Sequence, residues 1–226
     1  MNTKPLVPRE LAAVCLVTTA LLSGISLLTM PTWPDGFDAL LATVDKHPTT
    51  SLVSALTFVL AQLPLLVAAV AIGALVIPRK PLLGGLGVAL TVIGAFGHSV
   101  YGGVAMVQLE MAADSAHHGI HADLLTDLES SPLVLFMAMG LLGTVLGLLL
   151  LAIGLWRSHS VAGWIPAALA LFLVTEFVGS SITDWAAYAS SSLYLAALTG
   201  LAVARWQQPA GSAETPSEPV AEQPAH

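Results

Sequence analysis

Charged residues are scarce in this sequence. Only 9% of the 226 residues are Asp, Glu, Lys or Arg, whereas 56% are hydrophobic. A soluble globular domain carries roughly 25% charged residues. A chain of this composition has far more apolar surface than its own core can bury, so the scarcity of charge excludes a soluble domain. It indicates an integral membrane protein, whose constant partner is the lipid bilayer.

Cysteine is nearly absent, and so are the common functional motifs. The single Cys15 excludes an intramolecular disulfide and a cysteine-based metal cluster. The sequence contains no phosphate-binding glycine-rich loop, no H-E-x-x-H zinc motif, no paired-aspartate motif and no nucleic-acid signature. The stretch GHSVY (97–101) begins like a nucleophile elbow, but Tyr101 stands where the second glycine belongs and no strand precedes it. We therefore expect no nucleic-acid partner.

Six apolar runs are long enough to cross a bilayer, which takes about 20 helical residues. The sequence predicts an all-α polytopic protein with one six-helix transmembrane domain over residues 1–206. A signal peptide is the alternative for the first run, but no convincing A-x-A cleavage site follows it. The predicted spans are 11–30, 52–77, 82–109, 133–156, 161–183 and 186–204.

The basic residues predict the orientation of these spans. With six spans, Lys46 lies on one side of the membrane and all the other basic residues lie on the opposite side. Basic residues favour the cytoplasmic side, so the side opposite Lys46 is predicted to be cytoplasmic. Both termini are then cytoplasmic, and the Ala-rich, lysine-poor composition suggests a bacterial inner membrane. The tail 207–226 is rich in Pro, Ala, Ser and Glu, which predicts a disordered cytoplasmic segment. The basic residues on the cytoplasmic side are Lys4, Arg9, Arg79, Lys80, Arg157 and Arg205, and the tryptophans at the predicted interfaces are Trp33, Trp156, Trp164, Trp185 and Trp206.

The third and fourth spans each carry a face of small or polar residues. Small residues allow the backbones of membrane helices to approach closely, so these faces predict helix-packing surfaces. They could pack within the chain, form a homo-oligomer or attach the protein to a larger membrane complex. The residues are Gly84, Gly87, Thr91, Gly94, His98, Tyr101, Ala105 and Gln108 in the third span, and Gly140, Gly143, Gly147 and Gly154 in the fourth.

Three polar residues lie deep in different spans. A rise of about 1.5 Å per residue places Gln62, His98 and Glu176 roughly 12–18 Å below the outer ends of their helices, in one layer. An ionisable group at this depth is costly, so it usually lines a cavity or has a polar partner. His98 and Glu176 could share a proton, or they could merely satisfy each other and set the helix register. Haem bound through His98 would lack a second axial histidine within the spans.

The main hypothesis is a transporter-like protein that binds a small ligand or a cation at this layer, from the outer side, with proton exchange. His98 would relay the proton, and Glu176 would hold the charge. The side chains expected to complete the site are Gln62, Tyr101, Ser180 and Thr183.

Two other classes of function fit the same residues. An intramembrane enzyme acting on a lipid or isoprenoid would use Glu176 as a general acid and would need a deep apolar cavity beside it. An accessory subunit of a larger membrane complex would present the glycine faces of the third and fourth spans to another protein.

The second outer loop, residues 111–131, contains the remaining candidate site. His117 and His121 are four residues apart, and Asp114 lies one turn before His117. Such a set can bind zinc or copper, or report external pH. Gly119 interrupts the helix that would align these residues, and a solvated histidine-rich loop is the alternative. No other cofactor is expected. The first outer loop, residues 37–48, predicts a short interfacial helix.

Overall fold

A computed structural model describes residues 6–32, 34–183 and 185–207 of the chain. The regular elements within these ranges are all helical, and none of the described residues forms a strand. Residues 208–226 of the predicted tail (207–226), together with Lys4, Trp33 and Asp184, lie outside the described residues, whereas Gln207 is the last residue of α8. The elements are α1 (Arg9–Thr29), α2 (Phe37–Lys46), α3 (Pro48–Val76), α4 (Pro81–Ala113), η1 (Ser115–His117), α5 (His118–Glu129), α6 (Leu133–Ser158), α7 (Trp164–Phe177), η2 (Gly179–Ser181) and α8 (Trp185–Gln207).

Six of the described segments are long and apolar enough to cross a membrane: α1, α3, α4, α6, α7 continued by η2, and α8. This confirms the predicted all-α fold with six spanning helices and supports a multi-pass membrane protein. The outer surface of the bundle exposes large apolar side chains, among them Leu63, Leu82 and Phe96. Such a surface suits hydrocarbon rather than water.

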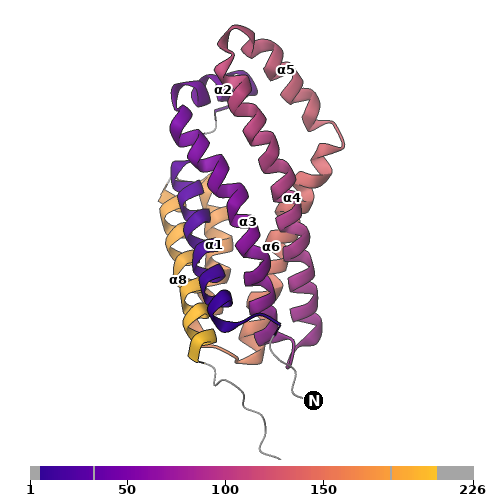
Figure 1. The fold of residues 1–226 in the computed structure, drawn as a ribbon, viewed down its shortest axis with the longest axis vertical. Coiled ribbons are helices and arrows are strands. Elements are labelled where there is room, and N and C mark those ends of the chain that lie inside the picture. Colours follow the sequence, from indigo (N-terminus) through magenta and orange to yellow (C-terminus); the bar gives the residue numbers. More distant parts are fainter. Residues whose placement is uncertain (1–5, 33, 184, 208–226) are drawn as a thin grey trace, which may run out of the picture.

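The spanning helices lie side by side (Figure 1), and their contacts close into a ring. Following the main contacts around the ring gives the order α1, α3, α4, α6, α7 and α8, and α8 packs back against α1. The first residue of α1 and the last of α8 lie at the same end of the bundle, which also carries Arg79 and Arg157. We call this the basic end.

The half of the bundle next to the basic end is filled by apolar side chains. Leucines and alanines from α1, α3, α6, α7 and α8 pack into one core there. A cavity of about 770 Å³ at this end is lined by α7, α8 and the residues just before α7. The core side chains themselves are 0–6% exposed and leave little space between them. The largest of them are Leu16, Ile72, Leu151, Leu155, Leu169, Leu198 and Leu201.

Helices α4 and α6 share the most extensive contact in the bundle. Glycines on both helices allow the two backbones to approach closely. A β-carbon on Gly94 would lie 2.4 Å from the backbone nitrogen of Thr144, and one on Gly97 would lie 2.3 Å from that of Gly140. The glycine faces of the third and fourth spans therefore pack against one another. This packing within the chain is one of the three alternatives that the sequence left open, and attachment to a second copy or to a larger complex stays a prediction.

Helices α2 and α5 form a cap over the opposite end of the bundle (Figure 1). Both pack against α4, and their core consists of Leu40, Leu41, Val44, Ala112 and Leu125. With 33 residues, α4 is about 50 Å long, whereas the hydrocarbon core is about 30 Å thick, so α4 extends beyond it into the cap. We call this the capped end. The short helix expected at 37–48 is present as α2, and the second loop is also helical, because α5 continues through Gly119.

Candidate functional site

The capped half of the bundle is hollow. A cavity of about 230 Å³ lies between the six spanning helices, and every one of them contributes side chains to its wall. We call it the central chamber. Its polar lining residues are Ser23, Ser26, Gln62, His98, Thr144, Glu176, Ser191 and Tyr194. The structure thus brings Gln62, His98 and Glu176, which the sequence placed in one layer, to one cavity.

His98 is held by three neighbours. Its Nδ1 lies 3.4 Å from Oγ1 of Thr144 on α6, and its ring meets the ring of Phe58 on α3 edge-on, with the centroids 5.2 Å apart. Its third contact is the backbone of Gly140, where a β-carbon would lie 2.5 Å from Cδ2 of His98. These contacts fix the imidazole at the edge of the chamber.

Glu176 reaches the chamber from the last turn of α7. Its carboxyl group is within hydrogen-bonding reach of the Ser190 side chain on α8. Among the described residues, no hydrogen bond or ion pair joins Glu176 to His98. The two ionisable groups therefore share the chamber without direct contact, and a ligand or water between them could connect them.

Two polar groups in the chamber wall have no partner within the described part of the chain. Gln62 is only 5% exposed, and its Nε2 donates to the carbonyl of Phe58 at 2.8 Å, but its Oε1 accepts nothing. The hydroxyl of Ser191 is likewise buried without a hydrogen bond. Burying a polar group without a partner costs roughly 1–3 kcal/mol. Both groups are therefore poised to bind a polar molecule in the chamber.

Three of the expected site residues lie elsewhere. Tyr101 lines two cavities nearer the capped end, whereas Ser180 and Thr183 are exposed. The Ser180 hydroxyl donates to the backbone carbonyl of Glu176, and Thr183 Oγ1 accepts from the Trp185 N–H. Their expected positions assumed that the helix continues beyond Glu176. However, α7 ends at Phe177, and the 3₁₀ turn that follows rotates both residues away from the chamber.

A second cavity of about 190 Å³ adjoins the central chamber on its capped side. The two cavities share Ser26, Met30 and Phe58, so the Phe58 ring lies at their boundary. We call the second cavity the capped-side chamber. Most of its wall is apolar, and this part consists of Met30, Pro31, Leu40, Val44, Ala55, Phe58, Gly102, Ala105 and Leu109.

Two serines join α1 to α3 in the wall of the capped-side chamber. The Ser26 hydroxyl donates to the carbonyl of Ser54 at 3.0 Å, and the Ser54 hydroxyl donates to the carbonyl of Ser26 at 2.8 Å. Isolated serines and threonines in apolar spans have no periodic pattern. Sequence analysis therefore did not single out Ser26 or Thr144 as members of the site.

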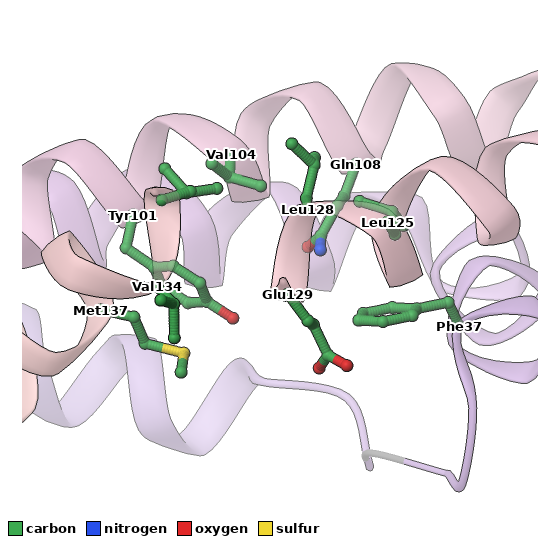
Figure 2. A pocket seen from close by; sticks show the side chains of 10 residues that line it. Phe37, Tyr101, Val104, Gln108, Leu125, Leu128, Glu129, Val134 and Met137 are labelled. Carbon is green, nitrogen blue, oxygen red and sulfur yellow. The ribbon is translucent and has the colours of Figure 1, made fainter. Parts of the chain in front are cut away.

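Two further cavities connect this region to the cap. A small pocket under α5 is lined by Tyr101 and Gln108, which it shares with the capped-side chamber, and by Glu129. Figure 2 shows the polar ends of Tyr101, Gln108 and Glu129 directed into the same space. The next cavity, of about 380 Å³, shares Phe37 and Glu129 with this pocket and adds Asp35. Four cavities that share lining residues thus lie between the acidic residues at the capped end and the pair Glu176 and His98.

The Asp114, His117 and His121 side chains do come together at the start of α5. His117 Nδ1 lies 3.0 Å from both carboxylate oxygens of Asp114, and His121 Nε2 lies 3.3 Å from one of them. The hydrogen bonds from His117 and then from His121 lower the pKa of the Asp114 carboxyl below its ordinary value. No group of three such residues within the described ranges is arranged to hold a metal ion.

Comparison with known proteins finds no relative of this chain. No protein-family model matches the chain, and neither a curated protein nor a solved structure matches it. Function is therefore argued from the geometry of the cavities.

Proposed function

We propose that the protein binds a small ligand in the central chamber and exchanges protons there, in the manner of a transporter. The observation that carries this proposal is the contrast between the two halves of the bundle. The half at the basic end has an apolar core between the helices, with a cavity beside it between α7 and α8, whereas the cavities of the capped half include the chamber lined by Glu176 and His98. A transporter that works by alternating access has a state in which its binding site is closed to one side of the membrane and open to the other. The described bundle fits such a state.

The capped end is the outer side in this proposal. The basic end carries Arg79, Lys80 and Arg157, and basic residues favour the cytoplasmic side of a bacterial inner membrane. Asp35 and Glu129 line the outermost cavities at the capped end, and an acidic opening concentrates cations. Both termini would then be cytoplasmic.

The ionisable groups of the central chamber are Glu176, His98 and Tyr194. Glu176 would hold a cation while ionised and release it when protonated. His98 would relay the proton, because its Nδ1 already faces the Thr144 hydroxyl and its ring borders the cavity. Gln62 and Ser191 would bind the ligand through the two groups that have no partner in the protein.

The apolar wall of the capped-side chamber supports a second candidate function. An intramembrane enzyme with Glu176 as general acid would place the hydrocarbon part of a lipid or isoprenoid in this chamber. Formation of a product from such a lipid by the purified protein, lost in Glu176→Gln, would favour this alternative.

Thiol accessibility tests the proposed function. In a Cys15→Ala background, Ser23→Cys places a reporter thiol in the central chamber, while Thr126→Cys and Lys80→Cys mark the capped and basic ends. In proteoliposomes, we expect membrane-impermeant trimethylammonium-ethyl methanethiosulfonate to label Ser23→Cys from the side on which it labels Thr126→Cys. Labelling from the Lys80→Cys side, or none, contradicts an opening at the capped end.

The pH dependence of labelling tests the role of Glu176. Labelling is measured with the cationic reagent and with neutral methyl methanethiosulfonate, and the ratio of the two rate constants is taken. Ionisation of the thiol changes both rate constants equally, so it does not affect the ratio. We expect this ratio to fall as Glu176 is protonated and to be independent of pH in Glu176→Gln. An unchanged pH dependence in Glu176→Gln removes Glu176 from the proposal.

A further inference from the structure

We infer that the ligand of the central chamber is a primary alkylammonium ion, with its ammonium group beside Glu176 and its hydrocarbon chain in the capped-side chamber. This inference rests on the proposed function and names the chemical class of its ligand. Four features of the two chambers support it: the balance of donors and acceptors, the aromatic wall, the small number of oxygen ligands and the apolar second chamber.

The central chamber offers acceptors and no fixed positive charge. Glu176 contributes a carboxyl group, and Gln62 contributes an Oε1 that has no partner among the described residues. No Lys or Arg lines the chamber, so an anionic ligand would meet the Glu176 carboxylate without a compensating cation. A ligand that carries positive charge and N–H donors satisfies these acceptors.

Aromatic rings form much of the remaining wall. Phe58, Phe172, Phe177 and Tyr194 all line the chamber, and the rings of Phe172 and Tyr194 are stacked with their centroids 4.2 Å apart. The faces of such rings attract cations, and they attract them more strongly where water is excluded. Because Phe172 and Tyr194 cover one face of each other, only their outer faces remain for a cation in the chamber.

An inorganic cation fits this wall less well. Hard metal ions such as Ca²⁺ take about six to eight oxygen ligands. The carboxyl group of Glu176, the amide of Gln62 and a few hydroxyl groups do not surround one point with that number, and the aromatic rings cannot replace them.

The capped-side chamber explains why the ligand should carry a hydrocarbon chain. Most of its wall is apolar, and it shares the boundary residues Ser26, Met30 and Phe58 with the central chamber. The polar residues of its wall are Ser26, Ser51, Ser54, Tyr101 and Gln108. The volumes of about 230 and 190 Å³ together fall within the roughly 300–1,000 Å³ of small-molecule sites. A molecule with one polar end and one apolar end matches the two chambers in this order.

Protection of the Ser23→Cys thiol measures binding. The rate of labelling by neutral methyl methanethiosulfonate is followed at pH 7 while n-hexylammonium, hexan-1-ol, hexanoate or hexyltrimethylammonium is added. We expect n-hexylammonium to protect at concentrations roughly tenfold to a hundredfold below those of hexan-1-ol, as for a hydrogen bond to a charged group. Hexanoate should not protect, and hexyltrimethylammonium, which has no N–H donor, should be weaker than the primary ammonium.

Two variants test whether the protection by n-hexylammonium arises from binding in the two chambers. Glu176→Gln should abolish the preference for n-hexylammonium over hexan-1-ol. Ala105→Phe fills the capped-side chamber and should weaken n-hexylammonium while leaving methylammonium unchanged. In the unfilled chamber, each added methylene should strengthen binding by up to about fourfold.

The outcomes separate this inference from the function on which it rests. If Ser23→Cys is labelled from the capped side but hexan-1-ol or hexanoate protects as well as n-hexylammonium, the ligand class is wrong and the proposed function stands. If Ser23→Cys is not labelled from that side, both are overturned. The comparison of head groups needs no substitution in the chamber wall other than the reporter, so it holds even if Ala105→Phe fails to fold.

Discussion

The imidazole of His98 lies against the backbone of Gly140, so close that a β-carbon on Gly140 would lie 2.5 Å from Cδ2 of His98 and 3.0 Å from its backbone nitrogen. This contact links the α4–α6 packing surface to the central chamber. The glycine that lets the two helices approach also determines where the imidazole sits. Packing and site geometry therefore depend on the same residue.

Gly140→Ala should destabilise the protein by about 1–3 kcal/mol, as expected for a methyl group forced into a filled contact. Thermal unfolding in mild detergent measures this effect. Gly103→Ala is the matched control, because a β-carbon on Gly103 meets nothing within 4 Å on the exposed side of α4. The control should unfold at the wild-type temperature or slightly above it, since alanine favours helix over glycine. Equal stability of the two variants would contradict the described α4–α6 contact.

The reciprocal hydrogen bonds of Ser26 and Ser54 allow a second test of the packing. Ser26→Ala and Ser54→Ala each remove one donor between α1 and α3, and each should cost about 0.6 kcal/mol, with about 1.7 kcal/mol as the upper limit for such bonds in membranes. Thr57→Ala is the control, because the Thr57 hydroxyl bonds only within α3. Chemical unfolding of the three variants in the same detergent gives the comparison. A loss in Thr57→Ala as large as in the serine variants would mean that the interhelical bonds add nothing.

The spans could be read from the sequence because hydropathy alone defines them. The depth of Gln62, His98 and Glu176 also followed from helical rise, and the structure brings these residues to one chamber. The failures have two causes. Ser180 was misplaced because the span was assumed to continue through Gly179 as an α-helix, whereas α7 ends at Phe177 and a 3₁₀ turn begins at Gly179, a residue that commonly follows a helix end. Thr144 was missed because the order of helices around the ring, which brings it to His98, is a property of the whole fold.

The cap offers a prediction about pH. Hydrogen bonds from His117 and His121 lower the pKa of Asp114 below its ordinary value of 3.8. A carboxyl group whose pKa is lower in the folded state stabilises that state fully above its unfolded pKa, and the stabilisation disappears as the pH falls through the folded pKa. The cap should therefore lose this contribution only below pH 3.8.

Carbon-13 NMR of the Asp114 carboxyl group measures the pKa directly. His117→Ala should raise the midpoint more than His121→Ala, because His117 Nδ1 lies 3.0 Å from both carboxylate oxygens and His121 Nε2 lies 3.3 Å from one. His118→Ala is the control, since His118 Nε2 bonds the carbonyl of Ala112 instead. The arrangement is contradicted if His118→Ala shifts the midpoint as much as His117→Ala does.

The Phe58 ring belongs to the walls of both chambers and contacts His98. Phe58→Ala should widen the connection between the chambers and admit larger molecules to the inner one. The expected result is a higher rate of labelling of Ser23→Cys by bulky neutral benzyl methanethiosulfonate, relative to the small methyl reagent. Taking the ratio corrects for any general change in the exposure of the thiol. Phe58→Tyr retains the ring and should retain the wild-type ratio, whereas an unchanged ratio in Phe58→Ala would show that molecules reach the inner chamber without passing Phe58.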